Sequence, residues 1–283
     1  MFFYITECAL NSNPPPSSQF SSVGVLEPHR RQFANFINPS PHAPRTPTMV
    51  YSRPSSLPVP TVWHRFTARG VTLRVQDLTQ QQVEPAVRLL LQHFTADEPP
   101  CKYIEINKHP GAVAELEKLW RNTIKDQLSL VCVEDVDEPK EIVGVNVLTV
   151  CSRSDEEEEF KTENRIWAKL FGAVELVGKS VDIFARFGVG RYLTAYGLVV
   201  APPWRGCGIG GEILRARIPL CKALGIKVTA TVFTAAASQA VAKKAGFHDL
   251  FQISYEELAR RGFLFPGVEE NTKYSKLMAL EII

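Results

Sequence analysis

The sequence predicts an α/β fold built around a mixed β-sheet. In the first half of the patterned region, β-rich runs follow one another as a hairpin, which favours antiparallel strands. In the second half a strand, a helix, another strand and another helix alternate, and this order favours parallel pairing. Both patterns occur in one chain without any internal repeat, so a single mixed sheet is expected.

Each element follows from its own pattern. Apolar residues spaced three and four positions apart predict helices, and runs rich in β-branched residues predict strands. The acidic run at 155–159 is expected to be a solvated loop, because like charges repel and extend a chain. The expected helices are 83–91, 112–125, 165–187, 209–224 and 236–245. The expected strands are 71–75, 129–133, 142–150, 193–200, 228–233, 247–253 and 275–283.

The N-terminal part of the chain has a different composition. Residues 1–62 are rich in proline and serine, and so many prolines remove backbone donors and interrupt both helical and strand periodicity. We therefore expect a disordered segment at 1–62 and a folded domain at 63–283. The segment is poor in acids and carries several arginines, which faintly resembles a transit peptide, although no amphipathic helix is evident.

Composition excludes several classes of function. The net charge is +2 and no basic stripe is present, so a nucleic-acid partner is not expected. The six cysteines are scattered without paired spacing, which argues against a zinc site or a disulfide framework and favours reduced thiols. No apolar run approaches the roughly 20 residues that a membrane helix needs. The expectation is a cytoplasmic, metal-free monomer with no membrane partner.

The most informative stretch is Leu198–Gly211, where a buried strand ends and glycines lead into a helix. Glycine lets the backbone approach a ligand closely, and the amides at a helix N-terminus attract anions. This predicts a site for a phosphate-bearing ligand. Gly206, Gly208 and Gly211 also fit the dinucleotide pattern G-x-G-x-x-G. That pattern requires an acidic residue about twenty positions later, and the next strand, 228–233, contains none.

The same turn resembles the acetyl-CoA motif of the GNAT superfamily of acetyltransferases, Gln/Arg-x-x-Gly-x-Gly/Ala. Arg205, Gly208 and Gly210 occupy its fixed positions, and the resemblance extends over about 71–283 to the Gly-Phe ending at Gly246. It implies the GNAT fold, a mixed twisted sheet of about seven strands with helices on both faces. It also implies that acetyl-CoA is the co-substrate and lies in a gap between two splayed parallel strands. The backbone of Leu198, Val199 and Val200 would pair with pantetheine, and the pyrophosphate would be held by the amides of Arg205, Gly206, Cys207, Gly208, Ile209, Gly210 and Gly211.

Within that superfamily the chain looks most like the insect arylalkylamine N-acetyltransferases. Residues 94–99, Phe-Thr-Ala-Asp-Glu-Pro, resemble the F-x-x-D-E-P signature of the group. Thr234 and Ser238 stand where these enzymes carry two hydroxyl residues four positions apart. The resemblance implies acetyl transfer to the primary amine of a small molecule such as dopamine, serotonin, octopamine or tryptamine. It further implies direct attack by the amine, with Glu98 as general base and Ser238 and Thr234 as catalytic hydroxyls.

Simpler interpretations stay open for these residues. Asp97 and Glu98 would also serve as caps of the loop after the first helix, and Ser238 as an N-cap. A burial that raises the Glu98 pKa would instead suit a base, because an amine attacks a thioester only when it is neutral. His93, His109 and His248 are isolated and are not expected to be catalytic, and Ala242 replaces the tyrosine acid of other relatives. A polyamine or amino-acid acceptor, or a non-catalytic acetyl-CoA-binding module, are the alternatives.

Overall fold

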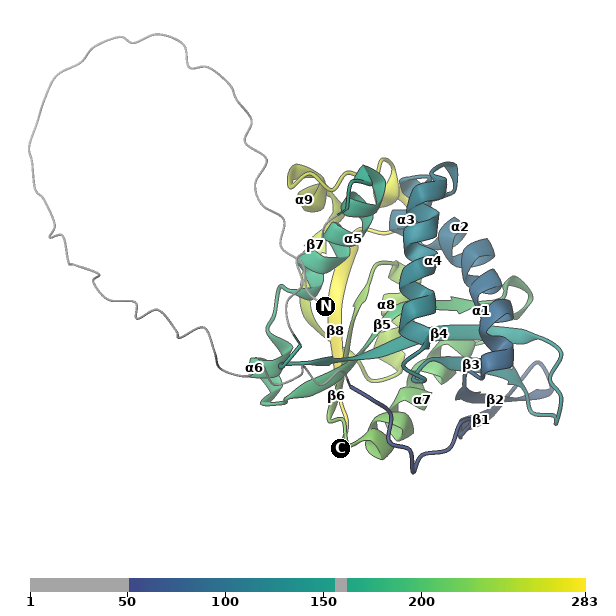
Figure 1. Cartoon of the computed structure of the whole chain (residues 1–283). Helices are drawn as coiled ribbons and strands as arrows, with labels where there is room; N and C mark the ends of the chain where they lie inside the picture. The colour runs from purple at the N-terminus through teal and green to yellow at the C-terminus, as the bar shows by residue number, and fades with distance from the viewer. Residues whose placement is uncertain (1–50, 156–161) are drawn as a thin grey trace, which may run out of the picture.

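The structure, a computed structural model, describes residues 51–155 and 162–283. Within these residues one sheet of eight strands runs in the order β1-β2-β3-β4-β5-β6-β8-β7 (Figure 1). The bounds are β1 Val62–Ala68, β2 Val71–Asp77, β3 Leu130–Glu134, β4 Ile142–Ser152, β5 Arg191–Val200, β6 Val228–Phe233, β7 His248–Ser254 and β8 Tyr274–Glu281. Strand β1 is one more than predicted. It directly follows the proline-rich residues, so sequence reasoning missed it, although it pairs antiparallel with β2.

Residues just before β1 make specific contacts with the domain. Arg53 forms an ion pair with Asp77 at 2.7 Å, and both side chains are almost fully buried. The amide of Thr61 donates to the same carboxylate at 2.8 Å. Arg53 and Thr61, which precede residue 63, thus both contribute donors to a buried carboxylate. Residues 1–50 of the expected disordered segment, and residues 156–159 of the acidic run, lie outside the described residues.

The described helices agree with most of the predicted ones. They are α1 Val83–Leu89, α2 Thr95–Asp97, α3 Pro99–Tyr103, α4 Pro110–Ile124, α5 Arg165–Gly178, α6 Ile183–Phe187, α7 Ile209–Leu224, α8 Ala236–Lys244 and α9 Tyr255–Arg260. The prediction of one helix over 165–187 is wrong. The chain leaves the helix after Gly178, and Asp182 starts a new one by accepting a hydrogen bond from the Ala185 amide at 3.0 Å.

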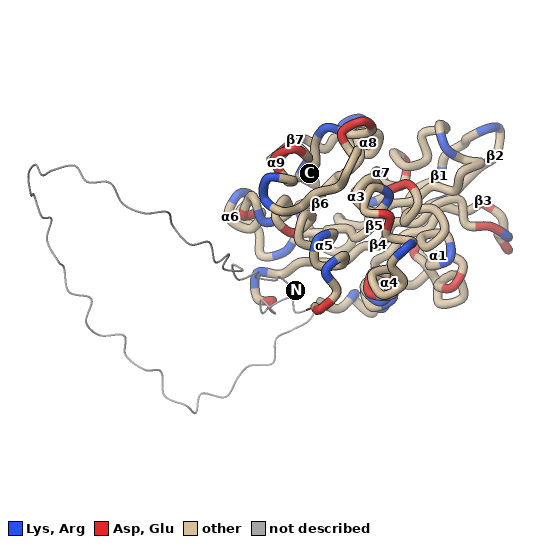
Figure 2. The backbone as a smooth tube through the Cα atoms, turned by 90° about the horizontal axis from the view of Figure 1, so that it is seen from above, with Lys and Arg blue, Asp and Glu red and all other residues tan. Residues whose placement is uncertain are grey.

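Helices cover both faces of the sheet, as predicted (Figure 1). Helices α1, α4 and α5 bury one apolar cluster, in which Trp120 is completely enclosed. Helix α7 buries a second cluster on the opposite face through Ile213 and Leu220. Acidic and basic residues are interspersed along the chain in Figure 2. No helix among the described residues has the length and apolarity to cross a membrane.

The centre of the sheet contains the feature that positions the site. Strands β4 and β5 pair antiparallel over almost the whole of β5, with an extra β5 residue near Tyr196. Strands β5 and β6 are parallel but pair only at Leu193 and Thr229. Beyond this pair the two strands separate towards their C-terminal ends. The C-terminal parts of these two parallel strands therefore have no hydrogen bonds between them. This is the splayed pair that the family resemblance implied.

Candidate active site

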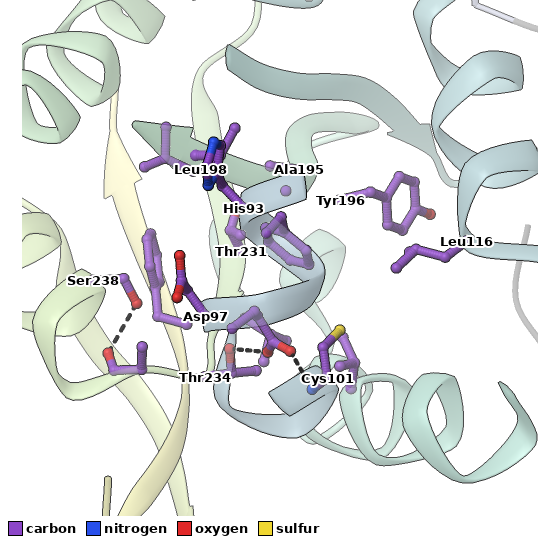
Figure 3. A pocket seen from close by; sticks show the side chains of 18 of the residues that line it. His93, Asp97, Cys101, Leu116, Ala195, Tyr196, Leu198, Thr231, Thr234 and Ser238 are labelled. Carbon is purple, nitrogen blue, oxygen red and sulfur yellow. Dashed lines mark hydrogen bonds between the residues drawn. The ribbon is translucent and has the colours of Figure 1, made fainter. Parts of the chain in front are cut away.

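A cavity of about 300 Å³ lies at the gap between β5 and β6. Its lining comes from both strands, from α5, from the start of α8 and from the residues around α2 and α3. Figure 3 shows side chains from these elements converging on one space, with Thr234 and Cys101 on one side and Leu198 and Ala195 on another. The predicted catalytic residues Glu98, Thr234 and Ser238 all line it.

Glu98 lies between α2 and α3 and has two hydrogen-bond donors. Its Oε2 accepts the backbone amide of Cys101 at 2.7 Å, which makes Glu98 the N-cap of α3. Its Oε1 accepts the Thr234 hydroxyl at 2.5 Å. Burial raises the pKa of the Glu98 carboxyl above its usual value, and these hydrogen bonds offset only part of that rise. The capping interpretation is thus correct for Glu98, and the same side chain also faces the cavity.

Thr234 and Ser238 have different surroundings. Thr234 directly follows β6, so its bond to Glu98 connects that carboxylate to the end of the strand. The Thr234 carbonyl accepts the hydroxyl of the buried Tyr255 of α9 at 2.8 Å. Ser238 lies in the first turn of α8, and its hydroxyl donates to the Ala235 carbonyl at 2.8 Å (Figure 3). The N-cap of α8 is Ala235, so the interpretation of Ser238 as an N-cap is wrong. Ser238 contacts the cavity, but no hydrogen bond joins it to Glu98.

The glycine turn leads into α7 as predicted. Gly206 and Gly208 have φ values of +77° and +79°, which are left-handed conformations that favour glycine. The Arg205 amide donates to Pro202 and the Gly211 amide to Gly208. Five successive amides therefore have no acceptor among the described residues, namely those of Gly206, Cys207, Gly208, Ile209 and Gly210. Together with the helix N-terminus, these five amides can donate to an anion. The amides of Arg205 and Gly211, which the resemblance also implied, donate within the turn itself.

Strand β5 offers a hydrogen-bonding edge to the same ligand. The Ala201 amide donates to Val143 of β4, so by the alternation of antiparallel strands Val199 also faces β4. Leu198 and Val200 then direct their backbone groups into the gap. The Val200 carbonyl accepts Arg205 Nε at 2.9 Å. An extended amide-containing chain such as pantetheine would thus pair with Leu198 and with the Val200 amide, while the backbone of Val199 is engaged by the neighbouring strand.

Arg205 also joins the turn to the helical side of the cavity. Its Nη2 lies 2.7 Å from Asp97 Oδ2, and both side chains are about half exposed. Such an exposed ion pair contributes little stability, but it brings α2 next to the glycine turn. The negative charge of Asp97 is therefore balanced by the positive charge of Arg205. Glu98 has no cation within ion-pair distance in the described chain, which separates the roles of the two adjacent acids.

Sequence reasoning missed the aromatic wall of the cavity. Phe94, Trp167, Phe171 and Tyr196 line it, and the ring centroids of Trp167 and Phe171 are 5.1 Å apart. Two of these residues lie one turn apart on α5, so the apolar stripe of that helix was the available signal. That stripe was used only to predict a helix. His93 lines the cavity as well, whereas His109 starts α4 and His248 lies on β7.

The arrangement is that of an acyl-CoA-dependent transferase: a phosphate site, an open strand edge, and a carboxylate with a raised pKa beside an apolar acceptor space. The described residues contain no group of His, Cys, Asp and Glu that would hold a metal ion. The glycine turn follows the end of β5 directly, and both Val200 and Arg205 line the cavity. One elongated ligand can therefore contact the turn and the gap between the strands.

Comparison with known proteins identifies the family. The profile described as Acetyltransferase (GNAT) family matches residues 113–247. A solved structure from the yellow fever mosquito Aedes aegypti, named arylalkylamine N-acetyltransferase 7, is 41% identical with a TM-score of 0.78, and the match covers 82% of this chain and 100% of the mosquito chain. The chain belongs to the GNAT family and is an acetyl-CoA-dependent N-acetyltransferase.

More distant structures share the fold. Arylalkylamine N-acetyltransferase 2 of Aedes aegypti is 21% identical, with a TM-score of 0.64 over 75% of this chain and 99% of its own. The Drosophila melanogaster polyamine N-acetyltransferase, which forms N-acetylagmatine, is 15% identical, with a TM-score of 0.57 over 74% of this chain and 100% of its own. No curated protein matches the chain.

Proposed function

We propose that this enzyme acetylates the primary amine of a small arylalkylamine and that Glu98 removes the proton from the attacking ammonium group. The observation that carries the proposal is the position of Glu98, a carboxylate without a cation that lines a cavity walled by aromatic rings. An aryl ring would pack against Trp167 and Phe171, and its ethylamine arm would point to the carboxylate.

The chemistry follows from the charge states. Arylalkylamines are mostly protonated at neutral pH, and only the neutral amine has the electron pair that attacks a thioester. A carboxylate whose pKa lies above the usual value is better matched to this proton transfer than an ordinary surface acid. Glu98 has such a pKa because of burial. Each oxygen of Glu98 accepts one hydrogen bond, Oε1 from Thr234 and Oε2 from the Cys101 amide, and a carboxylate oxygen has a second lone pair that can accept the ammonium proton.

The lining also favours an aryl over a polyamine acceptor. A polyamine carries a second cation, which needs a second free carboxylate. The acids that line the cavity are Asp97 and Glu98, and Asp97 already pairs with Arg205. The name of the mosquito relative agrees with an aryl acceptor. The fly polyamine enzyme is only 15% identical, so its similarity to this chain shows a shared fold and says nothing about the acceptor.

An acceptor screen tests this proposal. With acetyl-CoA as donor, kcat/KM should be higher for tryptamine and dopamine than for agmatine and spermidine. Replacing Phe171 by leucine should lower kcat/KM for the aryl amines by about two- to tenfold, the range expected for one aromatic contact. Phe184→Leu is the matched control, because Phe184 packs on Tyr192 outside the cavity. A preference for polyamines that Phe171→Leu leaves unchanged would contradict the proposal.

A further inference from the structure

Arg217 is a buried cation under the gap between β5 and β6. It lies on α7 with a relative exposure of 1%. Its Nε donates to Asn146 Oδ1 of β4 at 2.9 Å. Its Nη1 donates to the hydroxyls of Thr231 at 3.0 Å and Thr229 at 3.3 Å, both on β6. All of these acceptors are neutral, so none of them balances the charge.

No acid among the described residues pairs with this guanidinium. The ring of Phe247 lies under it at 5.8 Å, and the titratable neighbour on its own helix is the Cys221 thiol. Burial raises the pKa of Cys221 to about 12, so that thiol is protonated near neutral pH. Burial lowers the pKa of Arg217 to about 10, which still leaves it charged. A buried charge without a partner is destabilising, and an anion supplied by a ligand would offset that cost.

Two of the three guanidinium nitrogens of Arg217, Nε and Nη1, donate hydrogen bonds, whereas Nη2 makes none within the described residues. Arg217 is also one of the residues that line the cavity. Nη2 is thus available to a group that enters the gap from the opposite side of the sheet.

The level of Arg217 along the strands indicates which part of acetyl-CoA it meets. Its partner Asn146 pairs with Leu198, and Asn146 Nδ2 donates to the Gly197 carbonyl at 2.7 Å. Its other partner, Thr231, lies two residues beyond the last β5–β6 pair (Figure 3 labels Leu198 and Thr231). A ligand anchored by phosphates at the glycine turn would run back along β5 past Val200 towards Leu198, and its sulfur end would then reach the level of Arg217.

We propose that Arg217 contacts the sulfur of coenzyme A and stabilises the thiolate that leaves during acetyl transfer. The inference rests on the acetyl transfer to an amine proposed above. The amine nitrogen uses its electron pair to bond the carbonyl carbon, and the carbonyl π pair moves to oxygen. When that pair returns, the carbon–sulfur bond breaks and its electrons stay on sulfur. The nitrogen loses two protons in all. The first, from the ammonium group, passes through Glu98 to solvent before the attack, and the second, from the positively charged nitrogen of the tetrahedral intermediate, goes to Glu98. The new thiolate is neutralised by Arg217.

Coenzyme A binding tests this without any turnover. Calorimetry would compare coenzyme A with acetyl-CoA, whose sulfur cannot ionise, at several pH values from about 6.5 to about 9.5. Free thiols ionise near pH 8.5, so a cation at the sulfur should strengthen coenzyme A binding relative to acetyl-CoA by about tenfold as pH rises to that value. The acetyl-CoA reference cancels the titration of the other groups that line the cavity, which are His93, Asp97, Glu98, Cys101, Tyr196 and Arg205.

Variants assign the effect to Arg217. Arg217→Gln should abolish the pH dependence of the affinity ratio, and Arg217→Lys, which keeps the charge, should retain part of it. Lys222→Gln, on an exposed position of the same helix, is the matched control and should behave as wild type. Desulfo-CoA should bind wild type and Arg217→Gln alike, which a merely structural role of Arg217 would not predict.

Several results would overturn the inference. A flat ratio in the wild type, or the same slope in Arg217→Gln, would show that Arg217 does not contact the sulfur. Selective loss of succinyl-CoA binding in Arg217→Gln, with no effect of the thiol, would assign Arg217 to an acyl carboxylate instead. Failure of the wild type to bind acetyl-CoA at all would reject the proposed function itself, and so the two failures are distinguishable.

Discussion

The carboxylates of Asp77 and Glu98 are both partly or fully enclosed, but they differ in the number and charge of their hydrogen-bond donors. Asp77 accepts four hydrogen bonds, two of them from Arg53 at 3.0 and 2.7 Å and the others from Trp63 at 2.7 Å and the Thr61 amide at 2.8 Å. Glu98 accepts two, from the Thr234 hydroxyl and the Cys101 amide, and neither donor is charged. The carboxylate at the end of β2 is thus paired with a cation, whereas the carboxylate at the cavity has neutral donors alone and a raised pKa.

The difference separates structure from chemistry. Asp77 is saturated, in the sense that it accepts four hydrogen bonds, and these bonds connect β2 to β1 and to the residues before β1. This role is structural and needs no proton transfer. An unsaturated carboxylate costs stability but gives the reaction a base. Arg217 extends the comparison to a cation, since it too is enclosed without an opposite charge and lines the cavity. The two enclosed charges at the cavity, Glu98 and Arg217, thus lack charged partners, whereas Asp77 and Arg53 pair with each other.

The largest expected effect comes from removing the basicity of Glu98. Glu98→Gln keeps the shape of the side chain. Its amide oxygen can still accept from the Cys101 amide, and its NH2 group can donate to the Thr234 hydroxyl oxygen. Turnover at neutral pH should fall by about 10²–10⁴-fold, the usual contribution of a general base. The deficit should shrink at higher pH, because more amine is already neutral. The measurement is a pair of pH–rate profiles with tryptamine, and a gap below about threefold would remove Glu98 from the mechanism.

The same variant has an opposite effect on stability. The folded pKa of Glu98 lies above the ordinary value of 4.5, so the folded state binds the proton more tightly than the unfolded chain does. The wild type therefore loses stability as pH rises from that ordinary value through the folded pKa, and Glu98→Gln does not. At neutral pH the variant should be at least as stable as the wild type in chemical denaturation. A role limited to capping α3 predicts lower stability instead.

The second effect concerns the saturated pair. Arg53→Met should leave the Asp77 carboxylate enclosed without a cation and lower the free energy of unfolding by about 3–5 kcal/mol. The exposed pair of Arg65 and Asp135, at 2.9 Å, supplies the control, and Arg65→Met should cost less than about 1 kcal/mol. The double variant Arg53→Met with Asp77→Asn should recover part of the loss. Denaturation curves with equal losses in the two single variants would contradict the comparison.

The fold was largely predictable because its elements carry strong local patterns. Seven of the eight strands and the long helices α4, α7 and α8 agree with the periodicity of the chain. Strand β1 was missed because prolines at 58 and 60 adjoin it, and its pairing with β2 is a tertiary fact. The break between α5 and α6 depends on the Asp182 cap, which is a local signal but was outweighed by the continuous apolar spacing on either side.

The site was predictable where backbone conformation decides it and less so where side chains from distant segments meet. The turn has positive φ at Gly206 and Gly208, a conformation that glycine adopts readily. The two glycines are therefore a local signal that can be recognised in the sequence. The contact of Glu98 with Thr234 joins residues 136 positions apart. The family resemblance pointed to both residues as catalytic, but their positions in the sequence do not predict that they are in contact. Arg217 carried no signal, because an arginine in an amphipathic helix ordinarily faces solvent.

The smallest expected effect tests where the domain begins. Removing residues 1–50 should change the free energy of unfolding by less than about 0.5 kcal/mol and leave turnover unchanged, since proline-rich, acid-poor sequence has little apolar surface to bury. Removing residues 1–61 also deletes Arg53 and the Thr61 amide, so it should reproduce or exceed the loss of Arg53→Met. Turnover of the remaining folded enzyme should still match the wild type, because Asp77 does not line the cavity. The two truncations differ by eleven residues, and a comparison of their denaturation curves measures what those residues contribute. Equal stability of the two would mean that the donors to Asp77 are replaceable by water, and the contrast between a saturated and an unsaturated carboxylate would then lose its energetic basis.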